Sequence, residues 1–456
     1  MATYQQSRTI KQSYPMQRLP SELINEIFSL TLPGIPSFKP AESPLLLTTV
    51  CSTWRELAIS QSSLWDTIYL PSPNQGILSS GFIQLCHLWL KRSGNRSLSI
   101  DFHLSSDYQP LDITEAHQVA VHKVVKLLVP YAHRIFKLLR ISPQFLLGDL
   151  QLKNMTILDD LFLCDTANDR TGKIAVPFGS FQVPPTLRCL SLRQTFFDLR
   201  AFSSFNQIAH LDLWQLQGDG SMSIGTCLQV LRSMPWLESC TMDIAQAQNN
   251  CKLSDLGKSF IHMPNLTFLF ISWDWIVDVG PILDVLYTPI LKRLGLRGPP
   301  PPSPQQWSNL LHFLLRCKPQ LTQLSLKEIG YTDIQLLECL KLLPSITNLS
   351  ISQCPVDTFF IKALAANPKK LCAKKEIVLP SLEYLSLESC DNFEIKDLIS
   401  MLQSRGKGSP LPLKAVRLML CQKIADSTKT ELENCGVESM IIRVGKVAGR
   451  ASSHRL

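Results

Sequence analysis

An apolar pattern repeats along most of this sequence. Its unit places apolar residues at the first, fourth and sixth of six positions, as in LRCLSL from Leu187. The last three positions alternate apolar and polar, which is typical of a short strand with one buried face. From Leu187 to Val437, nine steps of the pattern cover 250 residues, a mean of about 28. A regular period of this length predicts a stack of similar structural units. The matching segments begin at Phe136, Leu158, Leu187, Ile208, Leu237, Leu266, Leu291, Leu321, Ile346, Leu382, Leu413 and Val437.

Proline precedes many of these segments and distinguishes the repeat from a chance pattern. With 30 prolines in 456 residues, chance predicts about one proline two residues before a dozen segments. Proline ends a helix and biases its neighbour toward extended backbone. The predicted unit is therefore a helix, a proline break, a short strand and a loop. The prolines at this place are Pro185, Pro235, Pro264, Pro289, Pro319, Pro344 and Pro380.

Helical segments lie where this unit needs them, at residues 305–318, 332–343 and 393–403. Ile334, Leu337, Leu340 and Leu343 are expected on one helix face. A single unit cannot bury both its apolar faces, so the units are expected to stack as a leucine-rich-repeat solenoid. Its parallel strands form the concave side and its helices the convex side. The asparagine expected after each strand is mostly missing, and Cys354 and Cys390 are expected to take its place.

The polar positions of the predicted strands point away from the core and form a candidate binding surface. Aromatic and arginine side chains at such positions are common anchors of protein interfaces. Two alternatives remain: other loops or helices cover these positions, or the register is shifted by one residue. His210 and Asp212 also occupy these positions, whereas Trp273 and Trp275 are expected to pack under the neighbouring repeat. The candidate substrate-binding residues are Trp214, Phe268, Phe270, Arg293, Arg297, Lys327 and Tyr384.

Residues 17–66 have a different pattern, which predicts three short helices. Ser21 is expected to cap the first helix, which ends near Pro33. Apolar stretches at 45–50 and 51–60 predict the other two. So small a module buries little surface by itself. Its many large apolar residues suggest either a face that a partner completes or a cap on the repeat array.

The segments LPSELINEIF, LLLTTVCSTWRELAIS and SLWDTIYL together resemble the F-box. The resemblance depends on Leu19–Pro20, Ile27–Phe28, Val50–Cys51, Trp54 and Leu64–Trp65 in this order. The insertion PGIPSFKPAES departs from a minimal F-box and is similar to F-box proteins abundant in mushroom-forming fungi. The expected fold class is thus α/β, with a small N-terminal three-helix F-box followed by a leucine-rich-repeat solenoid. The expected domains are a disordered basic arm (1–16), the F-box (17–70), a linker with first irregular repeats (71–142), the solenoid (143–444) and a disordered basic tail (445–456).

This resemblance implies a function. F-box proteins bind a Skp-type adaptor, which links them to a cullin-RING ubiquitin ligase, and their repeat domain captures a protein substrate. The chain would then be the substrate-recognition subunit of an SCF-type ligase and would catalyse nothing itself. The alternative is a leucine-rich-repeat interaction scaffold that binds no adaptor. The adaptor contacts that the resemblance implies are Leu19, Pro20, Leu23, Ile27, Phe28, Leu45, Val50 and Trp54.

Composition and motifs narrow the remaining classes of function. The net charge is +8, and seven of these charges lie in residues 1–18 and 441–456, so the body of the chain is nearly neutral. We therefore expect no broad nucleic-acid surface, although the basic tails leave an enzyme or nucleic-acid binder as a third hypothesis. C-x-x-C, H-E-x-x-H, Walker and G-x-S-x-G motifs are missing from the sequence, so no metal, cofactor or catalytic site is expected. The sequence shows neither a signal peptide nor a stretch able to span a membrane, so we expect a cytoplasmic or nuclear protein with free thiols.

Overall fold

The computed structural model divides into two compact units. The first comprises residues 1–174 and 181–187, and the second comprises residues 175–180 and 188–456. The expected terminal arms, residues 1–16 and 445–456, lie outside the described residues. The structure describes residues 19–34, 38–70, 80–102, 115–141, 150–164, 183–193, 205–214, 222–245, 259–274, 277–299, 306–366, 377–421, 424 and 426–443.

The first unit begins with the three predicted helices and continues with strand–helix repeats. Its strands pair in parallel in the order β1-β2-β3-β4. Strand β1 follows the third helix after one 3-10 turn, so the repeat array begins where the helical module ends. The helices are α1 (Ser21–Leu30), α2 (Leu47–Val50), α3 (Ser52–Ser60), α4 (Ser80–Arg92) and α5 (Glu115–Leu128), with 3-10 turns at Ser62–Leu64, Val129–Arg134 and Leu152–Asn154. The strands are β1 (Thr67–Tyr69), β2 (Leu98–Asp101), β3 (Ile135–Ile141) and β4 (Asp160–Cys164).

The helical module is fixed by a small core and by two hydrogen bonds. Phe28 of α1 is fully buried and packs on Trp54 of α3, with ring centroids 5.0 Å apart. The indole Nε1 of Trp65 donates to the carbonyl oxygen of Ala58 at 2.7 Å. Gln61 donates from Nε2 to the backbone oxygen of Asn25 at 2.8 Å. These contacts join the end of α3 to α1.

The start of α1 differs from the sequence prediction. Pro20 occupies the N-cap position, and no side chain caps the helix. Ser21 is instead the first helical residue, so its predicted capping role was wrong. The third helix does have a cap, because the Cys51 thiol accepts from the amide of Trp54 at 3.4 Å.

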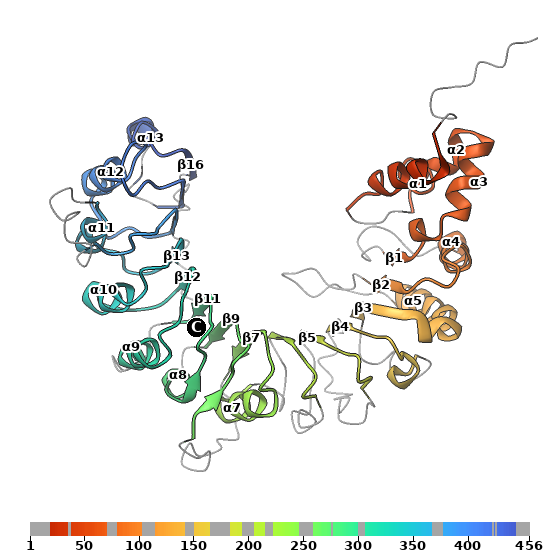
Figure 1. Cartoon of the computed structure of the whole chain (residues 1–456), viewed down its shortest axis with the longest axis horizontal. Helices are drawn as coiled ribbons and strands as arrows, with labels where there is room; N and C mark the ends of the chain where they lie inside the picture. The colour runs from red at the N-terminus through yellow and green to blue at the C-terminus, as the bar shows by residue number, and fades with distance from the viewer. Residues whose placement is uncertain are drawn as a thin grey trace, which may run out of the picture. The chain divides into compact units, whose positions relative to one another are not determined.

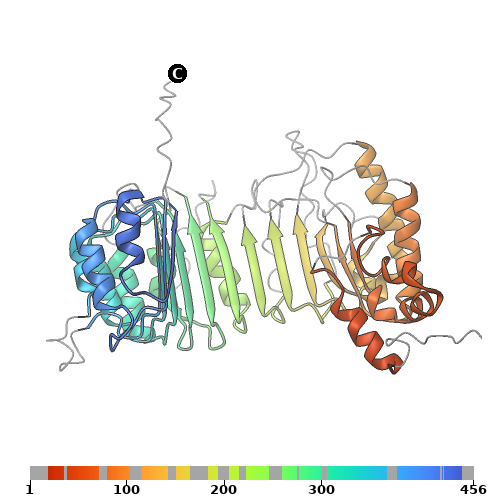
Figure 2. The ribbon, with the colours of Figure 1, turned by 90° about the horizontal axis from the view of Figure 1, so that it is seen from above.

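The second unit repeats the strand–helix unit, and its main sheet is parallel in the order β5-β6-β7-β9-β11-β12-β13-β14-β15-β16. Figure 2 shows these strands side by side and pointing the same way. With β1–β4, the described residues contribute 14 strands to parallel pairing. The strands are β5 (Cys189–Arg193), β6 (His210–Trp214), β7 (Ser239–Ile244), β8 (Ile261–His262), β9 (Phe268–Trp273), β10 (Leu286–Tyr287), β11 (Arg293–Arg297), β12 (Gln323–Lys327), β13 (Asn348–Ser352), β14 (Tyr384–Glu388), β15 (Ala415–Met419) and β16 (Ser439–Arg443). The helices are α7 (Ile224–Ser233), α8 (Gly280–Val285), α9 (Gln306–Cys317), α10 (Asp333–Lys341), α11 (Thr358–Ala363), α12 (Ile395–Ser404) and α13 (Asp426–Glu433).

Helices α7–α13 cover one face of this sheet and leave the other open (Figure 1). On a typical strand, such as β12, Leu324 and Leu326 are buried under the helices, while the residues between and beside them are half-buried or exposed. Each of the 12 predicted segments contains or adjoins an observed strand, which confirms the predicted solenoid of parallel strands and helices. We call the uncovered side of β5–β16 the open face.

Two details of the prediction need correction. Ile334 was expected on the buried face of its helix, but it lies in the first turn of α10 with 63% of its surface exposed. The helix starts there with a capping box between Thr332 and Gln335, which turns Ile334 outward. The segment at Phe136 is a strand in a different register, because Ile135, Leu138 and Ile141 are its buried residues.

Cysteines replace the expected asparagines between repeats. The Cys354 Sγ accepts from the amide of Ile329 at 3.4 Å and lies 3.7 Å from the carbonyl oxygen of Leu326. Cys390 makes the equivalent contact with the oxygen of Ile351, at 3.7 Å. Burial raises the pKa of Cys354 to about 11 and that of Cys390 to about 12. Both thiols are therefore neutral at pH 7, and the predicted replacement is confirmed.

Candidate functional site

Two surfaces stand out, one on each unit, and the first lies on the helical module. Exposed apolar side chains occur there on or beside each of the three helices, although soluble proteins usually bury such groups. Leu23 is 47% exposed, Val50 54% and Leu30 80%. Leu23, Ile27 and Leu30 follow one stripe along α1, because residues three and four apart share a helix face. We call the set Leu23, Leu30, Leu46, Val50 and Ile59 the apolar helical face.

The predicted adaptor contacts divide into three groups in the structure. Leu23, Val50 and Pro20 are exposed, as a contact surface requires, whereas Leu19, Ile27, Leu45 and Trp54 are half-buried. Phe28 has no exposed surface. It supports α1 against Trp54, so its place in the structure is the core of the module rather than its surface.

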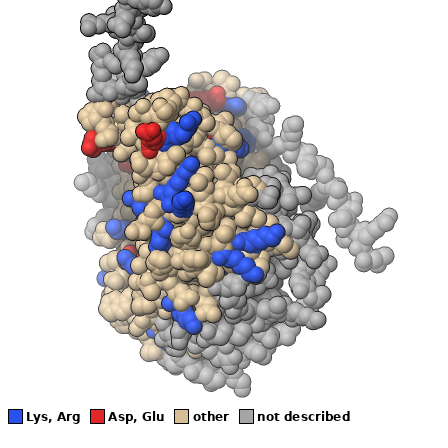
Figure 3. Space-filling view, turned by 90° about the vertical axis from the view of Figure 1, so that its right-hand side faces the viewer, with Lys and Arg blue, Asp and Glu red and all other residues tan. Residues whose placement is uncertain are grey.

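Three members of the apolar helical face, Leu30, Leu46 and Ile59, were missed in the sequence. The signal for Leu30 was present, because it lies seven residues after Leu23 on the same stripe of α1. On the side of the first unit seen in Figure 3, Lys and Arg outnumber Asp and Glu among the described residues. Residues 19–66 themselves hold five acidic and two basic residues, so this positive charge comes from the repeats that follow the helical module.

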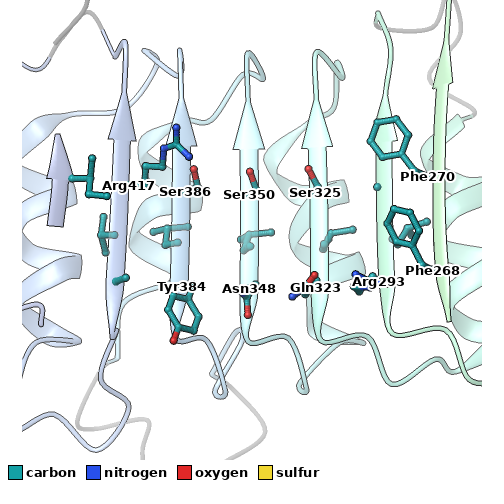
Figure 4. Close-up of a pocket in the computed structure, with 18 of the residues that line it drawn as sticks. Phe268, Phe270, Arg293, Gln323, Ser325, Asn348, Ser350, Tyr384, Ser386 and Arg417 are labelled. Carbon is teal, nitrogen blue, oxygen red and sulfur yellow. The ribbon is translucent and has the colours of Figure 1, made fainter. Parts of the chain in front are cut away.

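The second surface is a groove of about 460 Å³ on the open face, running across β9 to β16 (Figure 4). Strand pairing orders its side chains into two rows. The first row consists of Phe268, Arg293, Gln323, Asn348, Tyr384, Ala415 and Ser439, each paired with the next. The second row, two residues further along each strand, consists of Phe270, Gly295, Ser325, Ser350, Ser386, Arg417 and Ile441.

Small residues lower the floor of the groove. Gly295, Ser325, Ser350 and Ser386 follow one another in the second row, and Phe270 stands at the end of this run (Figure 4). A Cβ atom at Gly295 would lie 2.4 Å from Cδ2 of Phe270, closer than atoms can approach. Glycine is therefore required for the ring to lie over β11. The result is an apolar wall beside a shallow hydroxyl-lined floor.

The cations on the open face fall into two classes. Arg297 and Lys327 lie 3.6 and 3.7 Å from Glu328, and Arg193 lies 3.8 Å from Asp212. Each of these cations has an acidic neighbour within the protein, and Arg297 and Lys327 share the carboxylate of Glu328.

Arg293 and Arg417, in contrast, line the groove, and in the described part of the chain neither has a carboxylate at ion-pair distance. Arg293 instead places its guanidinium over the ring of Phe268, at 4.7 Å from the centroid. The groove lining contains no Asp or Glu among the described residues.

The predicted substrate residues are only partly brought together. Phe268, Phe270, Arg293 and Tyr384 line the groove. Trp214 lies beside it, with its ring centroid 6.0 Å from that of Phe270.

Arg297 and Lys327 lie outside the lining and are paired with Glu328. Arg417 was missed, although it occupies an outward position of the segment LKAVRL. Of the two predicted packing tryptophans, Trp273 is buried against Gly298, and Trp275 lies outside the described residues.

Two buried thiols of the second unit, Cys227 and Cys240, are held in their neutral form. Burial raises the pKa of Cys227 to about 12 and raises that of Cys240 as well. Across the described ranges, His, Cys, Asp and Glu nowhere form a group of three that could hold a metal ion. A search of the described helices finds none that combines the length and apolar character of a membrane span.

Comparisons with known proteins identify the helical module. No curated protein matches the sequence. Among solved structures, an internalin of Listeria monocytogenes matches with a TM-score of 0.33 and 13% identity, over 62% of this chain and 80% of that one. This score is too low to support an argument, so the repeat architecture rests on the strands and helices described above. The family model named F-box-like matches residues 16–71, the segment that contains the apolar helical face. The chain therefore carries an F-box-like domain at residues 16–71, followed by leucine-rich-repeat-like units.

Proposed function

We propose that this protein is the substrate-recognition subunit of an SCF-type ubiquitin ligase. In this role the F-box-like domain docks on a Skp-type adaptor, and the groove on the open face binds a protein substrate. The adaptor links the chain to a cullin-RING ligase, which carries out the chemistry. The chain contributes by raising the concentration of the substrate near the conjugating enzyme. We place this activity in the cytoplasm or nucleus.

The observation that carries the proposal is the apolar helical face. A folded module that leaves Leu23, Leu30 and Val50 in water exposes surface whose burial is favourable. Fully burying one such side chain contributes about 1.5–3 kcal/mol, so the exposed part of Leu23 contributes roughly half of that. Three such residues together supply about 2–4 kcal/mol of the binding energy. Their replacement should therefore weaken adaptor binding by about 30- to 1000-fold.

The test is co-purification of the full chain with a Skp-type adaptor, followed by titration calorimetry. The variant Leu23→Ser/Leu30→Ser/Val50→Ser removes the exposed groups and leaves the core residues intact. The matched control is Ile334→Ser, which removes an equally exposed apolar side chain from α10 in the second unit. Binding by the wild type and the control, with loss in the triple variant, supports the proposal. A folded wild-type chain that binds no adaptor contradicts it.

The alternative is a non-catalytic repeat scaffold in which the helical module only caps the array. The contact between Trp65 and Trp89 of α4 favours such a capping role, since the two rings meet edge to face at 4.6 Å. Capping and adaptor binding use different residues, because Trp65 and Trp89 are buried whereas the apolar helical face is exposed. The titration above therefore separates the two functions.

A further inference from the structure

The groove on the open face also contains information about what binds there. It runs across the strands, so a ligand that follows it passes over β11, β12, β13, β14 and β15 in turn. Arg293 lies on β11 and Arg417 on β15. Four strand spacings of about 4.8 Å separate them, and Arg417 lies two residues further along its strand, so the two backbones are about 20 Å apart along the sheet.

These two arginines are set apart from the other cations of the open face by their lack of a carboxylate partner. Arg193, Arg297 and Lys327 each have an acidic neighbour within the protein. Arg293 and Arg417 face the groove without one in the described structure, and no described acidic residue lines the groove. An unpaired arginine donates two parallel hydrogen bonds to a carboxylate, so each end of the groove is suited to an acidic group.

The surface between the two arginines limits the shape of the ligand. Its side chains are uncharged: Ser325, Ser350 and Ser386 on the floor, and Gln323, Asn348 and Tyr384 in the neighbouring row (Figure 4). Hydroxyl and amide groups of this kind can pair with the backbone of an extended segment. At the Arg293 end, the rings of Phe268 and Phe270 offer an apolar wall. A ligand with an apolar side chain at this end would cover them.

An extended segment matches these dimensions. Its residues rise about 3.3 Å each, so residues i and i+6 are about 20 Å apart, and because the period is two they point to the same side. An α-helix would need about 13 residues for the same distance and is about 10–12 Å wide, so an extended segment reaches both arginines with fewer residues and less width.

We propose that the groove binds an extended acidic segment of a protein substrate. Two carboxylate side chains about six residues apart would pair with Arg293 and Arg417, and an apolar side chain beside the first would pack on Phe268 and Phe270. This inference rests on the proposed receptor function, since it names the class of substrate that the repeat unit captures.

The experiment is a selection of random 12-residue peptides, displayed on phage, on the immobilised full chain. The expected result is enrichment of Asp or Glu at a spacing of six, with an aromatic or aliphatic residue next to one of them. Synthetic copies of the enriched peptides are then titrated by fluorescence anisotropy. Because each arginine makes charge-assisted hydrogen bonds, Arg293→Gln and Arg417→Gln should each weaken binding about tenfold. Ser350→Tyr, which fills the floor without changing charge, should also weaken it.

The control variant is Lys396→Gln, which removes one positive charge from α12 on the covered side of the sheet. It should leave peptide binding unchanged, and circular dichroism should show that all variants remain folded. Enrichment of basic or uncharged peptides, no enrichment at all, or insensitivity to both arginine variants would overturn the proposal. So would tighter binding of single-stranded RNA than of the enriched peptides at physiological salt.

The two proposals fail in different ways. Adaptor binding uses the first unit and should not respond to Arg293→Gln or Arg417→Gln. Failure of the selection with a chain that binds the adaptor removes this class of substrate and leaves the receptor function. Failure of adaptor binding with successful selection removes the ligase function and leaves the groove as a binding site for acidic segments.

Discussion

Replacement of Phe28 and replacement of Leu23 should have opposite consequences, although the two residues lie in the same helix and both resemble positions of the F-box. Phe28 is fully buried, and removal of such a side chain to alanine costs about 3–5 kcal/mol. Leu23 is 47% exposed, and its removal should change the free energy of unfolding by no more than about 0.5 kcal/mol. We therefore expect Phe28→Ala to unfold the helical module locally and Leu23→Ala to weaken adaptor binding without unfolding.

Hydrogen exchange followed by mass spectrometry measures this difference within the full chain. The chain has two units, so a single global unfolding curve would not report on the module alone. In Phe28→Ala, peptides from α1 and α3 should exchange about 10²- to 10⁴-fold faster, which corresponds to the loss of 3–5 kcal/mol. Peptides from α9 to α12 should be unchanged and serve as the internal control. In Leu23→Ala all peptides should match the wild type.

Adaptor titration completes the comparison. Leu23→Ala should weaken binding about threefold to tenfold at wild-type protection. The reasoning fails if Phe28→Ala keeps wild-type protection in α1 and yet loses adaptor binding. Such a result would mean that Phe28 leaves the core to contact the partner. It would return Phe28 to the contact surface that the F-box resemblance implies.

Three further predictions concern the second unit. Gly295→Ala should displace the Phe270 ring, because the new Cβ would lie 2.4 Å from that ring. The variant should therefore melt a few degrees below the wild type. An unchanged melting temperature and an unchanged position of the Phe270 ring in a crystal structure of the variant would contradict this. Burial raises the pKa of Asp212 above its ordinary value of 3.8, despite the nearby Arg193. The folded state therefore binds more protons than the unfolded state just above pH 4, and the charged Asp212 lowers the stability of the fold at pH 7. Asp212→Asn should then gain stability relative to the wild type as the pH rises from 3 to 7, and thermal melts at both values would show it; a gain at pH 3 only would refute it. Burial raises the pKa of the Cys390 thiol to about 12, so iodoacetamide at pH 8 should alkylate it only after denaturant is added. Peptide mass spectrometry can follow the modification. Rapid modification of Cys390 in the native chain would contradict the prediction.

The strands were predictable because their signal is local. Alternation of apolar and polar residues over five positions follows directly from the geometry of a strand with one covered face, and the repeat supplies many copies of it. The segment at Phe136 is a strand whose buried residues this local signal did not predict correctly. Arg140 has a positive φ of 54° and pairs with Asp101, so the end of β3 is irregular. The strand then buries Ile135 and Leu138 in place of Phe136 and Leu139, and of the three residues that the pattern marked only Ile141 is buried.

The contact surfaces were less predictable, because their residues are defined by neighbours from distant parts of the chain. In α1, apolar residues occupy both the stripe Ile24–Phe28 and the stripe Leu23–Leu30. The sequence shows that both are apolar, but only the packing of Trp54 on Phe28 and the burial of Ile24 and Phe28 show which stripe is inside. The core and the partner surface use the same residue types, so composition cannot separate them.

The sequence also could not show which positive charges on the open face are available to a ligand, whereas their ion pairs in the structure can. The outward positions of the repeats identified Arg293 and Arg297 equally, although the two differ in what surrounds them. Arg297 lies at ion-pair distance from Glu328, which follows the next strand and also pairs with Lys327. Arg293 faces a row of Gln323 and Asn348 and has no carboxylate at ion-pair distance in the described part of the chain. A solvent-facing cation that pairs within the protein gains little from a partner, because binding must first break that pair. An unpaired arginine in an acid-free groove has no such cost, so the pairing pattern across strands, rather than the number of cations, indicates where an acidic ligand binds.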